Sequence, residues 1–462
     1  MLILDCYCVE YKSGTDGIVK MSPRPIGIDL FAGAGGMSLG FEQAGFDVVA
    51  AVEIDPVHCA THEFNFPHCK VLPKSVVGLT GAEIRIAAGI GTRQVDVVFG
   101  GAPCQGFSMI GQRILEDPRN ALVRDFLRLV AELDAKHFVF ENVKGLTLGK
   151  HRQFLDEFVT KADDLGYDVQ LPWKVLDAAH FGVPQHRERL FLLGTKKGRT
   201  APKYPAPWTQ PADGRRKLKA ELKRGPTVED AIGDLPDADE FDALNRSDSV
   251  TGVKFAKPSN YAAELRCLTN EAWHFGYVRN WNPAVLTSSA RTGHTDISKR
   301  RFAQTAGGQT EPISRFYKLA ADGLSNTLRA GTDGARGAFT SPRPIHYMHN
   351  RCVTVREMAR LHGYPDWFRF HETKWHGARQ IGNSVPPPLA RAVAAEIMVA
   401  LGQVPTRPEL PIHLGDPKLL SHTISEAAMK FEVPAPPSKR DRKSGARKRK
   451  QYEIEAERLR AV

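Results

Sequence analysis

The stretch "IDLFAGAGGMSLGFEQAG" (residues 28–45) joins a short apolar run to a cluster of glycines and then to a helical pattern. Gly33, Gly35 and Gly36 fall where the backbone must bend sharply and lie close to a ligand. Glu53 ends the next apolar run, and a carboxylate at that edge of an open α/β sheet suits the two hydroxyls of a ribose. The stretch therefore predicts a nucleoside site, with a purely structural glycine turn as the alternative.

The glycine spacing indicates which kind of nucleoside is bound. It reads G-x-G-G rather than G-x-G-x-x-G, because Ser38 stands in place of the third glycine. In the longer motif, that third glycine allows the helix N-terminus to receive a pyrophosphate. A nucleoside without a diphosphate fits this turn better. S-adenosylmethionine is such a ligand, and we expect it as the cofactor.

Short apolar runs alternate with helical patterns over the first 200 residues, as in a βαβ succession. We predict strands at residues 26–31, 47–53, 95–100, 137–142 and 189–194, and helices at 36–44, 56–64, 120–133 and 151–165. The fold class that follows is α/β, with a doubly wound, Rossmann-like sheet.

Changes of composition divide the chain into five parts. We predict an N-terminal extension or mis-assigned start at 1–22, a catalytic domain at 23–200, a smaller and irregular domain at 201–376, a helix returning to the catalytic domain at 377–403, and a disordered Pro-rich and then basic tail at 404–462. Thr354 and Glu357 are spaced as a capping box, and Gly363 with Pro365 ends the helix that they begin.

Composition excludes several classes of protein. No apolar run approaches the roughly 18 residues of a membrane span, so we expect no membrane contact. Asp5 and Glu10 interrupt any secretion signal. We therefore expect a cytoplasmic protein that associates with the nucleoid. The seven cysteines lack paired spacing, so neither a metal nor a disulfide framework is expected. Residues 439–450 carry +7 of the +11 net charge, which supports nucleic-acid binding only weakly.

Cys104, in the uncharged stretch "GGAPCQGFS", is either a nucleophile or a packed thiol. The glycine-rich loop favours an accessible thiol. Glu141 in "ENVKG" ends a neighbouring strand, and "QHRER" places Arg187 and Arg189 on one face of the next strand. These features favour a reactive cysteine over a packed thiol.

Six blocks of sequence carry a specific resemblance. In order, they are "DLFAGAGG", "PCQGFS", "ENVKG", "QHRERLFLLG", "TVREMARLHGYPDWF" and "QIGNSVPPPLARAV", from residue 29 to about residue 400. The chain resembles the cytosine-C5 DNA methyltransferases of bacterial restriction-modification systems. The resemblance implies a monomeric DNA (cytosine-5-)-methyltransferase that acts on a flipped-out cytosine in double-stranded DNA, with a cognate restriction endonuclease as a partner.

The resemblance also implies roles for residues of the reacting site. Cys104 would attack C6 of cytosine, and Glu141 would hold a proton at N3. Arg189 would bind O2 of the base, and Arg187 would help to organise the site. Cysteine addition is needed because C5 of cytosine is a poor nucleophile until C6 has gained an electron-donating substituent.

On the cofactor side, Phe31 would face the adenine, Gly33 and Gly35 would line the methionine portion, and Glu53 would take the ribose hydroxyls. Further residues would complete that wall, namely Gly101, Pro103, Leu122, Asn383 and Ser384. Ser75 stands where the family usually has an acidic residue against the adenine amino group, so we expect a functional site with weaker adenine contact.

The irregular domain fills the position of the family's target-recognition domain. Arg329, Arg336 and Arg343 lie among glycines in predicted loops and suit contact to guanine or phosphate, with surface charges as the alternative. Ser108, beside the cysteine loop, is a further predicted DNA contact.

Three alternative functions remain at this stage. An amino-group methyltransferase would carry a D/N/S-P-P-Y/F/W motif, whereas "NSVPPPL" lacks the aromatic residue. The RNA-methylating branch of the family carries a Cys-Phe-Thr tripeptide, whereas Ala338 precedes the Phe-Thr here. A catalytically inactive DNA-binding regulator would not need the intact Cys104, Glu141 and Arg189.

Overall fold

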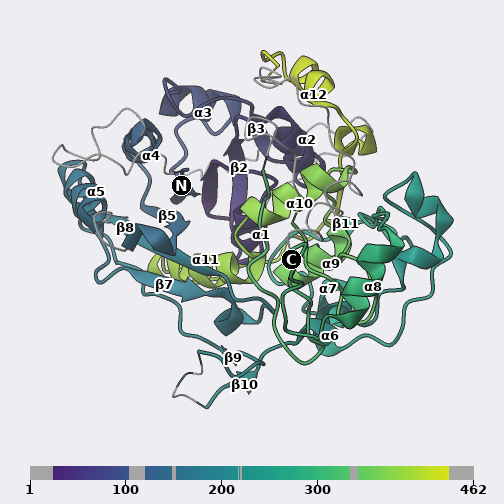
Figure 1. Cartoon of the computed structure of the whole chain (residues 1–462). Coiled ribbons are helices and arrows are strands. Elements are labelled where there is room, and N and C mark those ends of the chain that lie inside the picture. Colours follow the sequence, from purple (N-terminus) through teal and green to yellow (C-terminus); the bar gives the residue numbers. More distant parts are fainter. Residues whose placement is uncertain are drawn as a thin grey trace, which may run out of the picture.

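The computed structural model describes residues 24–103, 120–147, 152–216, 218, 221–332 and 342–435. Cys104, Ser108, Arg336 and the basic tail lie outside the described residues. Within them, the central feature is an eight-stranded sheet with the order β3-β2-β1-β4-β5-β8-β6, in which β7 also pairs with β8 (Figure 1). The α/β fold class is confirmed.

Parallel strands make up the first half of the sheet. They are β1 (Ile26–Leu30), β2 (Asp47–Val52), β3 (Lys70–Leu72), β4 (Val97–Gly100) and β5 (His137–Val143). Both faces of these strands are covered, so they are almost uniformly apolar and buried. Successive side chains of β5 alternate between two hydrophobic cores, since Val139 belongs to one and Phe138 and Phe140 to the other.

Five helices connect or flank these strands: α1 (Gly36–Gln43), α2 (Pro56–Asn65), α3 (Gly81–Ala87), α4 (Ala121–Glu132) and α5 (Arg152–Asp164). The four predicted helices all occur, within one or two residues at each end. The late helix α11 (Pro387–Ala400) returns to pack along α1. Gly40 permits this close approach, because a Cβ at that position would lie 2.4 Å from the Cβ of Ala390.

The strand β8 (Glu188–Lys196) runs antiparallel to β5, which the sequence analysis did not predict. Two short strands, β6 (Tyr167–Val169) and β7 (Lys174–Asp177), also pair with it antiparallel. An antiparallel β8 begins where β5 ends, and the register places Arg189 opposite Val143. The reversal therefore brings the start of β8 to the carboxyl edge of the parallel strands.

The second half of the chain consists of short elements joined by turns. They are β9 (Thr209–Gln210), β10 (Lys223–Arg224), α6 (Val228–Ile232), α7 (Asn260–Leu265), β11 (Arg279–Asn280), α8 (Asp296–Gln304), α9 (Val355–His362) and α10 (Lys374–Asn383). Thr354 and Glu357 form the predicted capping box at the start of α9, and Gly363 ends it at a φ of 86°.

The prediction of a disordered tail from residue 404 is wrong for residues 404–435. In this range lie β12 (Ile412–His413), which pairs with β11, and α12 (Ile424–Lys430), which packs on α2. Leu419 and Leu420 join Ala60 and Phe64 of α2 in a small core. The helix α12 lies at the top of Figure 1. Proline content suggested disorder, but these apolar side chains are buried against a helix. In the ranges that the structure describes, no helix has the length and apolar character needed to span a membrane.

Candidate active site

The glycine turn after β1 is built from left-handed backbone. Phe31, Gly33 and Gly35 have φ values of 67°, 56° and 101°. The N–H groups of Phe31 and Ala32 both donate to the carbonyl of Val52, at 2.9 and 3.1 Å. A Cβ on Gly35 would lie 2.4 Å from the Phe66 ring, whereas one on Gly33 would meet no atom within 4 Å. The turn is thus packed on its inner side and open at Gly33.

Glu53 lies immediately after β2, beside this turn. Its two carboxylate oxygens accept hydrogen bonds from the backbone N–H groups of Gly33 and Asp55, each at 2.8 Å. Each oxygen retains a further lone pair for a ligand. The next residue, Ile54, is 67% exposed and offers an apolar surface next to the carboxylate. A carboxylate for a diol beside an apolar surface for a ring is the pattern that a nucleoside requires.

A buried polar chain lies beneath the turn. The hydroxyl of Ser38 donates to Asp29 Oδ2 at 2.6 Å and lies 3.0 Å from Nε2 of His62. Burial raises the pKa of Asp29 from its ordinary value of 3.8 to about 8, and the charge of Glu53 adds to this effect. Asp29 is therefore a neutral acid at pH 7, and Ser38 ties β1 to the first turn of α1.

Residues 101–103, which follow β4, lie directly against β5. A Cβ on Gly101 would be 2.4 Å from Glu141 Oε2, so only glycine allows this approach. The side-chain amide of Asn142 donates to the carbonyl of Ala102 at 2.9 Å. These contacts direct the chain that leads into Cys104 toward the carboxyl edge of the sheet. Leu122, in the first turn of α4, packs partly buried at the margin of the adjoining core.

Glu141 and Arg189 form an ion pair at the same edge. Arg189 Nε lies 2.9 Å from Glu141 Oε1, and both side chains are largely buried, with 14% and 12% exposed. Burial raises the pKa of Glu141, although the charges of Arg189 and Arg187 oppose the shift. A carboxyl group with elevated proton affinity beside a guanidinium can present a proton and an N–H donor to one planar ring.

Arg187 is fully buried and forms no ion pair with a carboxylate of the described residues. Its guanidinium donates to the carbonyls of Leu328, Gly382 and Ser384, at 2.9, 2.7 and 2.8 Å. Ser384 in turn lies against the glycine turn, because a Cβ on Gly36 would be 2.8 Å from the Cβ of Ser384. Arg187 therefore holds the Gly382–Ser384 segment, which comes from the far end of the chain, close to the nucleoside site.

Comparison with known proteins gives a consistent result. The profile of the C-5 cytosine-specific DNA methylase family matches residues 27–399. The chain belongs to this family. The Type II methyltransferase M.XorII of Xanthomonas oryzae pv. oryzae is 58% identical over 410 residues, which are 89% of this chain and 93% of that protein. The Type II methyltransferase M1.HphI of Haemophilus parahaemolyticus is 33% identical and covers 85% of this chain and 91% of its own length.

A solved structure supports the same assignment. The crystal structure of an Escherichia coli protein, described as a DNA modification methyltransferase encoded within a prophage, superposes with a TM-score of 0.63 at 32% identity. It covers 82% of this chain and all of that one. The protein is thus a DNA cytosine-C5 methyltransferase of the Type II, restriction-modification class, as the sequence analysis predicted.

The predicted cofactor residues of this methyltransferase fall into two groups. The first group is the glycine turn and its carboxylate, with Phe31, Gly33, Gly35 and Glu53. The second group lies on two segments: Gly101 and Pro103 on the segment against β5, and Asn383 and Ser384 on the segment that Arg187 holds. Ser75 is farther along the chain after β3, and its hydroxyl accepts a hydrogen bond from the N–H of Val77 at 3.1 Å.

The methyltransferase's predicted DNA contacts require one correction. Arg329 is exposed, as a DNA contact must be. Arg343 is only 6% exposed, and its guanidinium donates to the carbonyl of Val353 at 2.9 Å and to the hydroxyl of Thr292 at 2.6 Å. It is a structural residue, and the interpretation of it as a DNA contact is wrong. Glycines in the sequence suggested an exposed loop, but the segment from Pro344 packs into the domain.

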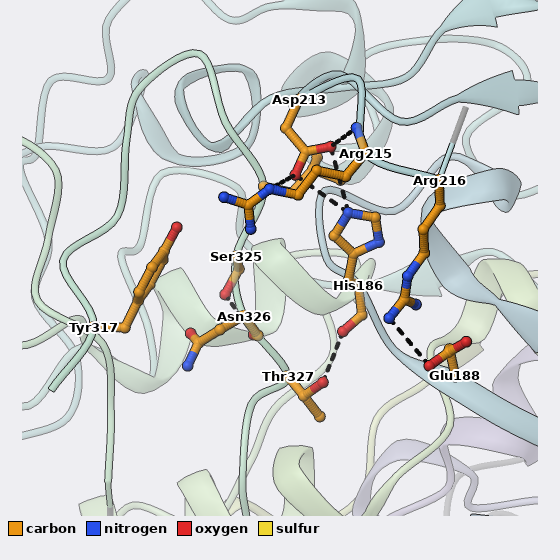
Figure 2. Close-up of a pocket in the computed structure, with 10 residues that line it drawn as sticks. His186, Glu188, Asp213, Arg215, Arg216, Tyr317, Ser325, Asn326 and Thr327 are labelled. Carbon is orange, nitrogen blue, oxygen red and sulfur yellow. Dashed lines mark hydrogen bonds and ion pairs between the residues drawn. The ribbon is translucent and has the colours of Figure 1, made fainter. Parts of the chain in front are cut away.

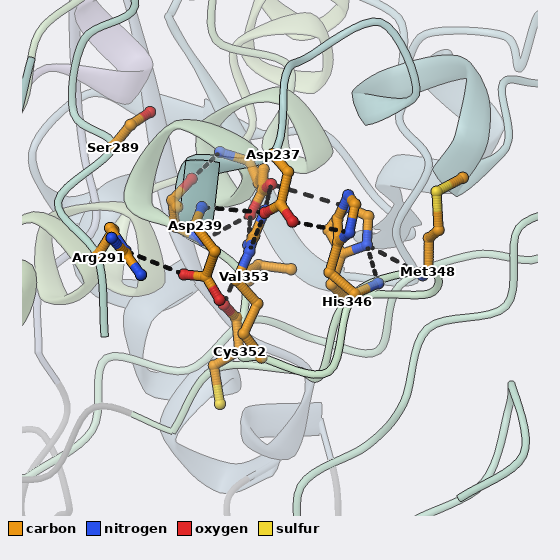
Figure 3. Close-up of polar contacts among 12 residues, drawn as sticks. Asp237, Asp239, Ser289, Arg291, His346, Met348, Cys352 and Val353 are labelled. Atoms are coloured by element: carbon orange, nitrogen blue, oxygen red, sulfur yellow. Dashed lines mark hydrogen bonds and ion pairs between the residues drawn. The ribbon is translucent and has the colours of Figure 1, made fainter. Parts of the chain in front are cut away.

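A buried polar network lies in this half of the methyltransferase (Figure 3). Arg351 pairs with both Asp237 and Glu357, at 2.8 Å in each case, and His346 lies 3.6 Å from Glu357. Arg291 pairs with Asp239 at 3.2 Å. The network fixes the loops of an irregular domain that has little regular hydrogen bonding of its own.

A polar cavity of about 240 Å³ adjoins the start of β8 (Figure 2). The ring of His186 lies between Asp177, at 2.8 Å, and Asp213, at 3.2 Å. Burial disfavours the charged ring, but the bond to Asp177 outweighs it and raises the pKa of His186. Neither this residue nor Gln185 was assigned a role from the sequence, although both lie in the block "QHRER". Ile54 was not assigned a role from the sequence either. Its position, an apolar residue directly after the glutamate that ends a strand, was the signal that could have indicated one.

Proposed function

We propose that this DNA methyltransferase transfers a methyl group from S-adenosylmethionine to C5 of a flipped-out cytosine, with Cys104 as the nucleophile. The Glu141–Arg189 pair, packed against the segment that leads into Cys104, carries the proposal. Neighbouring bases cover both faces of a cytosine inside a duplex, and bonds to C6 and C5 form from those faces, so the base must leave the stack.

The residues around the glycine turn fit S-adenosylmethionine. Glu53 offers carboxylate lone pairs for the ribose, Ile54 an apolar surface for the adenine, and the open side of Gly33 room for a ligand. The bound cofactor supplies a methyl group on a positively charged sulfur. Asn383 and Ser384 close the site from the far end of the chain, since Arg187 fixes their backbone.

In the reacting site the thiolate of Cys104 forms a bond to C6 of cytosine, and Glu141 gives its proton to N3. Together these changes place an electron pair at C5, which takes the methyl group. Arg189 donates to O2 of the ring. Loss of the C5 proton to a base, departure of the thiolate from C6 and return of the N3 proton to Glu141 then restore the aromatic ring. The products are 5-methylcytosine and the demethylated cofactor.

A trapping experiment tests this proposal. Incubation with S-adenosylmethionine and duplex DNA containing 5-fluorocytosine is expected to give a covalent protein–DNA adduct, because fluorine at C5 blocks elimination. Cys104→Ala is expected to give none. Absence of an adduct from the native protein would support the inactive-regulator alternative.

A second assay separates DNA from RNA as the substrate. Labelled cofactor is expected to label duplex DNA and leave transfer RNA unlabelled, and bisulfite sequencing of DNA from expressing cells then gives the methylated sequence. The Type II relatives also support a partner endonuclease. DNA methylated by this protein is then expected to resist cleavage by an endonuclease that recognises the same sequence.

A further inference from the structure

The start of β8 is joined to the segment 325–328 by a continuous run of hydrogen bonds, which we name the seam. The N–H of Ser325 donates to the carbonyl of Pro184 at 2.8 Å, and the N–H of His186 donates back to the carbonyl of Ser325 at 3.2 Å. The hydroxyl of Thr327 donates to the carbonyl of His186 at 2.8 Å (Figure 2). The seam is therefore an isolated parallel bridge, extended by the Thr327 hydroxyl, between residues 184–186, just before β8, and residues 325–327.

Leu328 is held at both of its backbone polar groups. Its N–H donates to Gln185 Oε1 at 3.1 Å, and its carbonyl accepts from Arg187 at 2.9 Å. Gln185 and Arg187 are both buried, so water does not compete for these bonds. The exposed Arg329, the predicted DNA contact, follows directly, and its backbone cannot move without breaking the seam.

Gln185 extends the seam toward the cofactor wall. Its Nε2 donates to Nδ1 of His362 at 3.0 Å, so the ring of His362 carries its proton on Nε2. That nitrogen lies 3.1 Å from the hydroxyl and 3.2 Å from the carbonyl of Ser384. Burial lowers the pKa of His362, which keeps the ring neutral and this arrangement fixed.

A direct backbone contact closes the connection. A Cβ on Gly382 would lie 2.3 Å from the backbone nitrogen of Ala330 and 2.4 Å from the carbonyl carbon of Arg329. The segments 328–330 and 382–384 therefore touch without intervening side chains. Arg187 bonds to both of them, at Leu328 and at Gly382.

We propose that Gln185 is a positioning residue that couples DNA recognition to cofactor binding, because it joins the segment bearing Arg329 to the wall formed by Asn383 and Ser384. The inference rests on the proposed function, which assigns DNA contact to the first segment and cofactor contact to the second. DNA binding that orders residues 328–330 also orders residues 382–384, so each ligand tightens the binding of the other by the same factor.

Calorimetric titration tests the coupling with S-adenosylhomocysteine, the product, as the probe, so that no turnover occurs. Its affinity is measured with and without a duplex that contains a cytosine methylated by this protein. For the native protein we expect the duplex to tighten binding about 10-fold, within the range usual for coupled sites. The reverse titration must give the same factor.

Two variants interrupt the connection at different points. Gln185→Leu removes the bonds to Leu328 and His362, and Gly382→Ala separates the two backbones. Both are expected to reduce the factor to about 2-fold or less. Tyr167→Phe is the matched control, because it loses buried bonds to Val130 and Ala135 far from the seam, and it should keep the native factor.

The inference would be overturned if the duplex left the affinity of the native protein for S-adenosylhomocysteine unchanged. It would also be overturned if either folded variant showed the same increase in affinity as the native protein. Neither result bears on the proposed function, since the trapping assay on the native protein measures that separately. Failure of the adduct to form would instead remove the proposed function, whatever the factor is.

Discussion

Glu141 and Asp29 are both buried carboxyl groups near the carboxyl edge of the sheet, but their surroundings differ. Glu141 has Arg189 beside it, and the guanidinium opposes the rise in pKa that burial causes. Burial raises the pKa of Asp29 to about 8, the charge of Glu53 adds to the rise, and the hydrogen bond from Ser38 opposes it. Burial therefore favours the protonated form of both groups, and Glu141 is the one that has a paired guanidinium to counter it.

Glu141→Gln is expected to slow methyl transfer without preventing cofactor binding. The amide fills the same space beside Gly101 but cannot give a proton to N3, and general acid catalysis contributes about 10²- to 10⁴-fold. Single-turnover transfer to duplex DNA measures the rate, and titration with S-adenosylhomocysteine measures binding. A rate within about twofold of the native one would show that Glu141 is not the acid.

Asp29→Asn is expected to stabilise the fold at pH 7. The folded protein holds a proton on Asp29 up to about pH 8, whereas the unfolded chain releases it near the ordinary value of 3.8. Stability is therefore lost as pH rises between these values, and asparagine removes this loss. Urea unfolding from pH 4 to pH 8 measures the effect. A native protein and variant with parallel pH profiles would contradict the assignment.

Helix–helix and segment–helix packing determine how far the structured core extends. The segment 412–430 packs on α2, whose start at Pro56 follows Glu53, a proposed cofactor contact, closely in the chain. Leu420 is fully buried there, while Met429 of α12 is 77% exposed. The C-terminal segment therefore supports the helix that begins beside the cofactor site.

Leu420→Ala is expected to lower the free energy of unfolding by about 2–5 kcal/mol, because it leaves a cavity between η9 (Pro417–Leu420) and α2. Met429→Ala is the control and should change it by less than about 0.5 kcal/mol, since that side chain is exposed. Denaturant unfolding measures both. Equal effects would mean that the segment does not pack on α2 in solution.

At the scale of the whole molecule, a buried ion pair joins the two halves of the chain. Arg279, the first residue of β11, donates to both carboxylate oxygens of Glu42 in α1, and its guanidinium lies 4.5 Å from the centre of the Trp367 ring. Burial raises the pKa of Glu42, but the charge and hydrogen bonds of Arg279 outweigh burial and lower it. The pair fixes the second half of the chain against the helix α1, which packs on the sheet.

Glu42→Gln is expected to destabilise the whole protein by about 3–5 kcal/mol, because it leaves the charge of Arg279 buried without a counter-charge. The matched control is Glu271→Gln, which breaks the exposed pair with Arg407 and should cost less than about 1 kcal/mol. Thermal unfolding followed by tryptophan fluorescence compares the two. A Glu42→Gln protein as stable as the control would show that the pair does not hold the halves together.

The sequence by itself determined most of the local structure and the candidate site. The five predicted strands and four predicted helices lie within two residues of observed elements, because apolar periodicity, glycine turns and capping residues such as Thr354 act over a few neighbours. The short strand β3 and the helix α3 were not predicted. Glu141, Arg189 and Glu53 lie where the expected sheet edge placed them. Cys104 stays a prediction, since it lies outside the described residues.

Only the tertiary structure decided the direction of β8, the burial of Arg343, the packing of residues 404–435 and the meeting of Leu328 with Gly382. Each depends on contact between segments that are far apart in the chain. A local pattern states that a residue is apolar or charged, but not which distant partner covers it. The free energy of burial, which decides these arrangements, is a property of the assembled surfaces.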